Sequence, residues 1–121
     1  MAEPLTHVGR RAPKLDAMAK AIGAAEYTHD LRRPRMLYGK ILRSAHAHAR
    51  IVNLDTTRAK RVSGVKAVLT ADDILYIPFG FGKDNVALKG GKVRSYRDEI
   101  AAVAAINEDT ADEALSLIQV D

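Results

Sequence analysis

Residue types that are capable of chemistry occur at four places in the chain. His46 and His48 offer two imidazoles, and Asp72 and Asp73 offer two adjacent carboxylates. Imidazoles two residues apart share a face only in extended backbone, and no third ligand stands nearby in the sequence, so we expect strand-end packing or hydrogen bonding instead of a metal site. Adjacent residues of a helical turn point about 100° apart. The aspartates are therefore expected to cap a helical turn and not to share one substrate.

The other two places are the glycine-rich sequences Gly80-Phe81-Gly82 and Gly90-Gly91. Neither has the complete spacing of a dinucleotide or Walker motif, and neither leads at once into a convincing helix, so tight turns are favoured over a nucleotide site. Phe79 and Phe81 leave two interpretations open, namely core packing or an aromatic surface that faces a ligand. The residues themselves indicate no catalytic, cofactor-binding or metal-binding group in this chain.

The composition excludes several classes of protein. The chain has 121 residues, enough for one modest core, and no Cys, which rules out disulfides, thiolate catalysis and Cys-ligated zinc or iron–sulfur clusters within it. Its 47% hydrophobic and 28% charged residues are typical of a folded domain and not of disorder. No apolar run approaches the roughly 20 residues that span a bilayer. The N-terminus also lacks the apolar segment of a signal peptide, so we expect no membrane contact and a cytoplasmic location.

The net charge of +4 raises the question of nucleic acid. The basic residues are dispersed and are not interleaved with aromatic side chains, as a stacking platform requires. We therefore expect no nucleic-acid binding, and a solvated or subunit-facing basic surface instead. The local clusters are Arg10-Arg11, Arg32-Arg33, Arg35 and Lys60-Arg61.

The elements that must position these residues fall into two parts. Residues 1–35 are expected to form a long irregular N-terminal segment with one short helix at 15–22, because proline and glycine interrupt it. Residues 36–121 are expected to form one α+β domain, a small mixed β-sheet with packed helices. The patterns predict strands at 37–43, 50–54, 65–70 and 100–106, the last leading through a helix capped by Asn107 or Thr110 into a strand-like 118–120, as part of a β-α-β unit.

Three further features are expected within the domain. A helix capped by Asp55 or Thr56 is expected to end near 63–64, and Thr70 is expected to cap a helical turn through residue 74. Residues 75–92 are expected to form a long, glycine-rich loop of the kind that is often functional. The chain ends within a strand-like element, from which we expect an artificial or processed end. The expected core residues are Ile41, Ile51, Val68, Val103, Leu115 and Ile118.

The order and spacing of the motifs from Val8 to Asp121 resemble the start of the large molybdenum subunit of the xanthine oxidase/aldehyde oxidase family of molybdenum hydroxylases. The resemblance is carried by Arg43-Ser44-Ala45-His46-Ala47-His48-Ala49-Arg50-Ile51, by Thr70-Ala71-Asp72-Asp73-Ile74 and by Leu117-Ile118-Gln119-Val120-Asp121. Within the family, Ile77-Pro78-Phe79-Gly80 and residues 100–106 look most like the 4-hydroxybenzoyl-CoA reductase branch.

The resemblance implies an α/β hammerhead domain within an oxidoreductase. It implies molybdopterin, [2Fe–2S] clusters and FAD for the complete complex, but none of them in this chain, and a His46-x-His48 pair without metal. It also implies that the 75–92 loop approaches the substrate channel, with Phe79, Gly80 and Phe81 as channel residues. The implied partners are the rest of the large subunit and iron–sulfur and FAD subunits or domains. The alternative is a free-standing, non-catalytic binding or interaction module with the same fold, which a reading frame that does not continue past Asp121 would favour.

Overall fold

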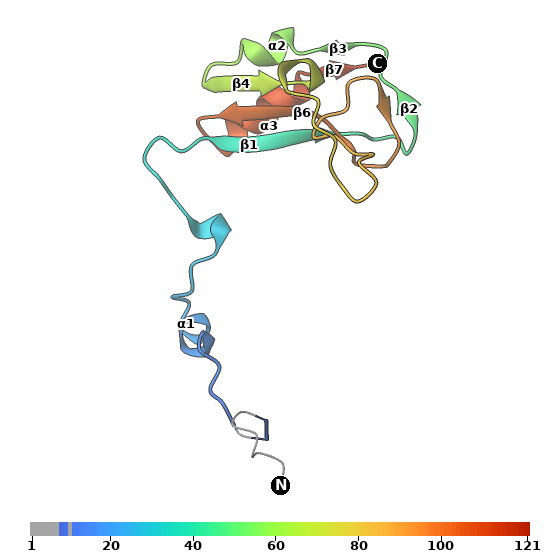
Figure 1. The fold of residues 1–121 in the computed structure, drawn as a ribbon. Coiled ribbons are helices and arrows are strands. Elements are labelled where there is room, and N and C mark those ends of the chain that lie inside the picture. The colour runs from blue at the N-terminus through green and yellow to red at the C-terminus, as the bar shows by residue number, and fades with distance from the viewer. Residues whose placement is uncertain (1–7, 10) are drawn as a thin grey trace. The chain divides into compact units, whose positions relative to one another are not determined.

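The computed structural model describes residues 8, 9 and 11–121 (Figure 1). Within the predicted N-terminal segment and its basic clusters, residues 1–7 and Arg10 lie outside the described residues. The chain divides into two units, Met1–Arg33 and Pro34–Asp121. No helix in the described part of the chain is long and apolar enough to cross a membrane.

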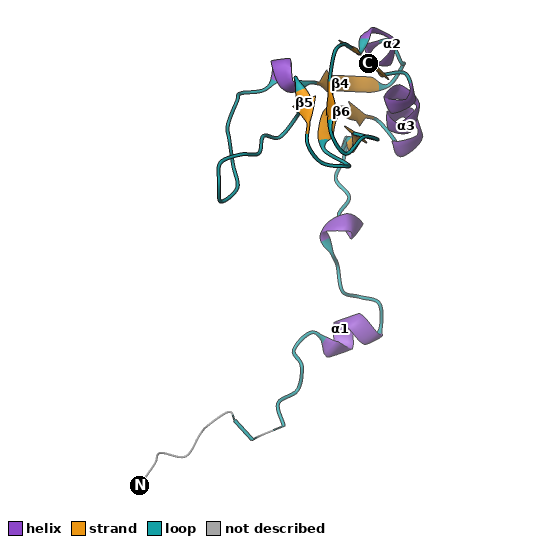
Figure 2. Cartoon of the chain, turned by 90° about the vertical axis from the view of Figure 1, so that its right-hand side faces the viewer, coloured by secondary structure: helices purple, strands orange, loops and turns teal. Residues whose placement is uncertain are grey.

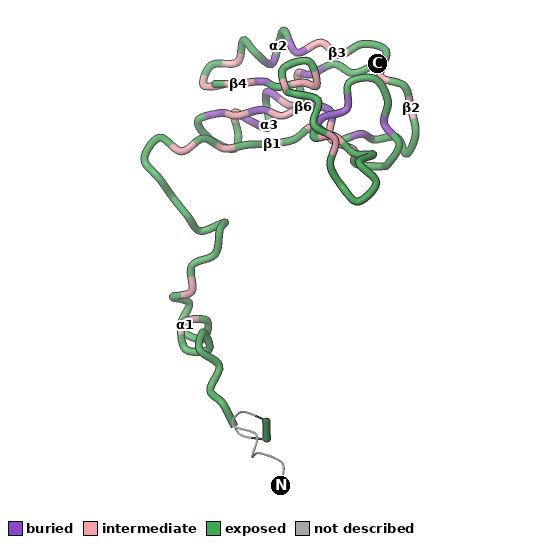
Figure 3. The backbone as a smooth tube through the Cα atoms, in the orientation of Figure 1, coloured by how far each residue is buried: buried purple, intermediate pink, exposed green. Residues whose placement is uncertain are grey.

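The first unit contains two short helical elements joined by irregular chain. Helix α1 spans Ala17–Ala21, within the predicted 15–22, and the 3-10 turn η1 spans Thr28–Asp30. Lys20 forms an ion pair with Asp16 at 2.5 Å, which joins positions i and i+4 of this turn. α1 has no buried residue, and Leu15 and Met18 are exposed (Figure 3). The unit is thus held by local contacts and has no core of its own among its described residues.

A three-stranded sheet forms the centre of the second unit (Figure 1). Its central strand β6 (Glu99–Ala105) pairs with β1 (Tyr38–Arg43) on one side and β4 (Val65–Leu69) on the other. Both pairings are antiparallel. A sheet of mixed strand direction was predicted, and this sheet is purely antiparallel. The predicted strands at 37–43, 65–70 and 100–106 are otherwise confirmed to within one residue.

Two small strand pairs border this sheet and correct the prediction for 50–54. β2 (Ala49–Arg50) pairs with β5 (Lys92–Val93), whereas β3 (Leu54–Asp55) pairs with β7 (Gln119–Val120). The predicted single strand is split because its two ends have different partners. β7 therefore does not join the sheet of β6, and the expected β-α-β unit is not formed.

Two helices lie on one side of the sheet (Figure 2). Helix α3 (Glu108–Ser116) contacts β1 and β6, and α2 (Thr57–Lys60) contacts β4 and α3. Asn107 caps α3 as predicted, since its side-chain oxygen accepts the Thr110 N–H at 2.8 Å. α2 ends before the predicted residues 63–64. Gly64 is therefore not the end of the helix but part of the turn before β4, where it has φ +92° and its carbonyl accepts the Ile106 N–H at 3.1 Å.

The core lies between these helices and one face of the sheet. Val68, Val103 and Ile118 are 5%, 2% and 8% exposed, as predicted, and Leu115 is partly buried against them. Five alanines without exposed surface form a close-packed seam among β6, α2 and α3, which we call the alanine seam: Ala59, Ala101, Ala105, Ala111 and Ala114.

The prediction of Ile41 as a core residue is wrong, because its side chain is 44% exposed. Strand alternation places its neighbour Lys40 on the α3 side, where Lys40 forms ion pairs with Glu108 at 3.5 Å and Asp112 at 3.2 Å. Ile41 consequently lies on the opposite face of the sheet. Ile51 is only half-buried, since it follows the two-residue strand β2 at the edge of the unit.

Candidate functional site

The 75–92 loop follows the 3-10 turn η2 (Ala71–Asp73) and leads into β5 (Figure 1). Its outer part is a tight turn closed by a two-residue bridge. The Phe79 N–H donates to the Asn85 carbonyl at 2.9 Å, and the Asn85 N–H donates back at 3.4 Å. Gly80 adopts φ +90° and Lys83 φ +50°, and the Lys83 N–H donates to the Gly80 carbonyl at 3.2 Å. Glycine suits position 80 because residues with a Cβ rarely adopt that conformation.

The tip of this turn presents Phe81. Its side chain is fully exposed, and Phe79 at the bridge is 48% exposed. Phe81 therefore does not pack in the core of the 121 residues, which was one of the two interpretations left open by the sequence. Exposed aromatic or aliphatic side chains precede the turn at Leu75, Tyr76 and Ile77. The role of the loop in a substrate channel stays a prediction.

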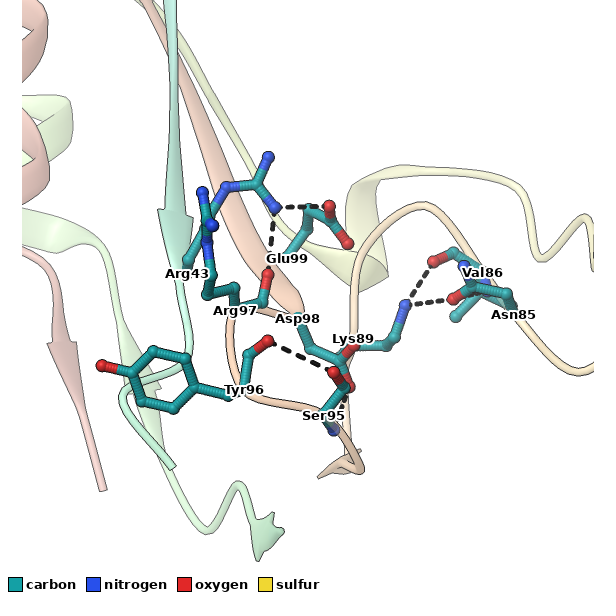
Figure 4. A network of polar contacts seen from close by, with 9 residues as sticks. All are labelled: Arg43, Asn85, Val86, Lys89, Ser95, Tyr96, Arg97, Asp98 and Glu99. Atoms are coloured by element: carbon teal, nitrogen blue, oxygen red, sulfur yellow. Dashed lines mark hydrogen bonds and ion pairs between the residues drawn. The ribbon is translucent and has the colours of Figure 1, made fainter. Parts of the chain in front are cut away.

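Lys89 occupies the base of the turn (Figure 4). Its residue surface is only 8% exposed. The ammonium donates to the Asn85 side-chain oxygen at 2.5 Å and to the Val86 carbonyl at 2.6 Å. The Lys89 main-chain N–H donates to the Glu99 carbonyl at 2.8 Å, which attaches this residue to the start of β6.

An ion pair continues this network onto β1 (Figure 4). Arg43 Nη1 donates to the Glu99 carboxylate at 2.6 Å and to the Arg97 carbonyl at 3.0 Å. The hydrogen bond from Arg43 is the main reason that the pKa of Glu99 lies below its usual range, and the positive charge of Lys89 acts in the same direction. The positive charges of Arg43 and Lys89 thus both favour the ionised form of this carboxylate.

Asp98 organises the turn that precedes β6. Its carboxylate accepts the N–H groups of Arg94 at 2.8 Å and Ser95 at 3.2 Å. Two main-chain hydrogen bonds between this turn and Ser44 then fix the end of β1. The Ser44 N–H donates to the Asp98 carbonyl at 2.8 Å, and the Arg97 N–H donates to the Ser44 carbonyl at 3.1 Å. Sequence reasoning missed both Asp98 and Lys89. The available signals were an acidic residue that closes a polar turn and a lysine directly after an apolar Val-Ala-Leu run.

His46 and His48 lie in the bend between β1 and β2, and both side chains are exposed. The expected packing is therefore not observed. Hydrogen bonding at this strand end uses main-chain atoms, because the Ser44 hydroxyl donates to the His46 carbonyl at 2.8 Å and accepts its N–H at 3.0 Å. A cleft of about 380 Å³ opens beside this bend, with Val93, Ile100 and Ile118 among its lining residues.

The remaining candidates have structural roles. The Asp73 carboxylate accepts both the N–H and the hydroxyl of Thr70 at 2.8 Å, which lowers the pKa of Asp73 and confirms the capping role predicted for this aspartate. A Cβ at Gly90 would lie 2.9 Å from the Ala71 Cβ, so close chain approach explains this glycine.

The described residues contain no group of three or more His, Cys, Asp or Glu side chains that could hold a metal ion, and the whole sequence has no Cys. With no Cys in the sequence, this chain has no thiolate ligands for an iron–sulfur cluster. That the chain alone binds no cofactor stays a prediction.

Comparison with known proteins gives concordant results. The family described as "Aldehyde oxidase and xanthine dehydrogenase, a/b hammerhead domain" matches residues 22–121. A probable xanthine dehydrogenase subunit of Bacillus subtilis is 43% identical over 113 residues, which cover 88% of this chain and 14% of that protein. The carbon monoxide dehydrogenase large chain of Afipia carboxidovorans is 37% identical over 125 residues, which cover 99% of this chain and 16% of that protein.

The fold is likewise similar to that of solved structures. The crystal structure of a Cu,Mo-CO dehydrogenase in its carbon monoxide reduced state matches with a TM-score of 0.85 and 36% sequence identity, over 93% of this chain and 15% of that one. The chain thus spans about one seventh of the length of each of these three proteins.

Proposed function

Because the chain belongs to the aldehyde oxidase and xanthine dehydrogenase family of hammerhead domains, we propose that it is the N-terminal domain of the molybdopterin-binding large subunit of an oxidoreductase of this type. In this proposal molybdopterin is bound by the rest of the large subunit, and [2Fe–2S] clusters and FAD by partner subunits or domains. The complex is cytoplasmic and contacts neither nucleic acid nor membrane. The chain itself contributes architecture and one wall of the substrate channel.

The exposure of Phe81 is the observation that carries the channel role. The chain has only two Phe, four Tyr and no Trp, yet one Phe stands fully exposed at a glycine-rich tip. An exposed aromatic ring on a turn that is tied to a sheet offers a large apolar contact at low entropic cost. Phe79, Gly80 and Phe81 are accordingly the proposed channel residues.

We propose more narrowly that the substrate is an aromatic acyl-CoA and that the complex reduces it in the way that 4-hydroxybenzoyl-CoA reductase does. Its support is the sequence Ile77-Pro78-Phe79-Gly80 in the candidate loop. Oxidation of a purine or an aldehyde is the competing outcome. A free-standing interaction module remains the alternative function, and it predicts a purified protein without cofactor-bearing partners.

The test is steady-state kinetics on the complete complex that contains this chain. We expect Phe81→Ala to change kcat/KM by about 10- to 200-fold for a substrate whose contact it removes, with molybdenum, iron and flavin content unchanged. Phe79→Ala is measured alongside. Tyr96→Ala is the matched control, since Tyr96 is also an exposed aromatic residue but lies outside the loop.

The substrate panel is xanthine, an aldehyde, carbon monoxide and 4-hydroxybenzoyl-CoA. Preferential turnover of the last would support the narrower assignment, and turnover of xanthine or the aldehyde alone would reject it. Unchanged kinetics in both Phe79→Ala and Phe81→Ala would remove the channel role and leave this domain a purely architectural one.

A further inference from the structure

Lys89 is the only charged residue among residues 8, 9 and 11–121 that is buried. The ion pairs within these residues involve Lys20, Lys40 and Arg43, but not Lys89. Its ammonium is held instead by two neutral oxygens, those of the Asn85 side chain and the Val86 main chain. Burial of a charge that forms no ion pair is costly, so a lysine at this place needs an explanation.

Both oxygens belong to the closing side of the turn that carries Phe81. Asn85 forms the bridge to Phe79 through its main chain and receives the ammonium through its side chain. The same side-chain oxygen also accepts the Val86 N–H at 3.0 Å. The side-chain position of Asn85 is therefore coupled to the bridge from which the 80–84 tip extends.

The other end of Lys89 is fixed to the sheet. Its N–H bond to the Glu99 carbonyl is made at the first residue of β6, and the preceding Leu88 is also 8% exposed. The Glu99 carboxylate is in turn held by Arg43 of β1. Lys89 is thus bonded to the start of β6 through its main chain and to Asn85 and Val86 through its side chain (Figure 4). The turn that ends at Asn85 carries glycine at residues 80 and 82.

We propose that Lys89 is a positioning residue: its buried ammonium sets the place of the 79–85 turn, and hence of Phe81, relative to the three-stranded sheet. The consequence for catalysis rests on the proposed channel role of the loop, whereas the consequence for the turn itself does not. Lys89 contacts no substrate and acts through Asn85 and Phe81.

The first measurement is hydrogen exchange of the complete complex, followed on peptides that cover residues 79–86. Lys89→Met removes both charge-assisted hydrogen bonds but keeps the long apolar stem, so exchange of these amides should accelerate by about tenfold or more. Lys89→Arg should restore most of the protection, because the guanidinium also donates several hydrogen bonds. Lys66→Met, a change of an exposed lysine on β4, is the matched control and should leave exchange unchanged.

The second measurement is a kinetic cycle with Phe81→Ala. Lys89→Met should lower kcat/KM about tenfold in the unsubstituted background, and Lys89→Arg should recover it. In the Phe81→Ala background the same change should have almost no further effect, because the side chain through which Lys89 acts is gone. A purely structural defect would lower kcat/KM by the same factor in both backgrounds.

The two proposals fail differently. Unchanged exchange in Lys89→Met, or equal kinetic losses in both backgrounds, would overturn the positioning role while a Phe81→Ala effect still supported the channel. Faster exchange in Lys89→Met, together with unchanged kinetics in both Phe79→Ala and Phe81→Ala, would support positioning of the turn and remove the channel role. If Lys89→Met does not assemble, Lys89→Gln, which keeps a neutral donor, should show intermediate exchange, and wild-type exchange in it would count against the proposal.

Discussion

Truncation of Val103 tests the central strand of the fold. Val103 is 2% exposed on β6 and pairs with Lys40 of β1 and Val68 of β4. Val103→Ala removes two methyl groups from this position and leaves the strand backbone intact. The expected result is a clear loss of stability with no change in secondary structure.

The magnitude follows from burial. Each buried methylene-sized group contributes about 0.8 kcal/mol, so the transfer part is roughly 1.6 kcal/mol. A cavity that does not collapse adds about 1 kcal/mol at ~24 cal/mol per Å³. We therefore expect a loss of about 2–3 kcal/mol in the free energy of unfolding, a large part of the 5–15 kcal/mol typical of a domain.

Urea unfolding of the 121-residue chain, followed by far-ultraviolet circular dichroism, measures this loss. Val52→Ala is the matched control, because it deletes the same two methyl groups from a side chain that is 78% exposed. It should change the free energy of unfolding by no more than about 0.5 kcal/mol. If the two variants lost equal free energy of unfolding, with the slope of that free energy against urea concentration unchanged, the placement of β6 at the centre of the core would be refuted.

Two further predictions concern the backbone and pH. Gly64→Ala should destabilise the chain by at least about 1 kcal/mol, since φ is +92° and the new Cβ would lie 2.9 Å from Ile106 Cδ1. Gly91→Ala is the control and should be tolerated, because its new Cβ would meet no atom within 4 Å. Equal melting temperatures of the two variants would contradict this prediction. The pKa of Glu99 is lowered chiefly by Arg43, so the stability that this carboxylate contributes is present above the unfolded-state pKa of about 4.3 and is lost as the pH falls through the lower folded-state pKa. Between about pH 5 and pH 2 the free energy of unfolding should accordingly fall less steeply with decreasing pH for Glu99→Gln than for the unsubstituted chain.

The sequence predicted best where the signal is local. The end of β6 follows from an apolar run and was placed to within one residue. The start of α3 follows from a cap whose partner is three residues away, and the structure selects Asn107 from the two predicted caps, Asn107 and Thr110. The tight turn at Gly80-Phe81-Gly82 was also predicted, because glycine at these positions suits a turn, whereas the exposure of Phe81 was left open. In these places the residues decide the structure without help from distant chain.

The sequence failed where distant chain decides. Ile41 and Leu42 are equally apolar neighbours in a strand, and only the position of α3 determines which of them faces the core. The break of the 50–54 segment depends on partners that follow some 40 and 65 residues later, β5 and β7. Lys89 looked like an ordinary surface lysine, because its burial exists only once residues 85 and 86 fold back over its side chain.

The alanine seam has a consequence for how natural variants of this domain should be judged. In most cores, harmful substitutions make side chains smaller and leave holes. Along Ala59, Ala101 and Ala111 little can be removed, because each is an alanine without exposed surface in the core between the helices and the sheet. Tolerance is therefore asymmetric, because an added methylene has no room and must displace an entire helix or strand. In a population, a change from alanine to valine here is of more concern than the same change at an ordinary core position.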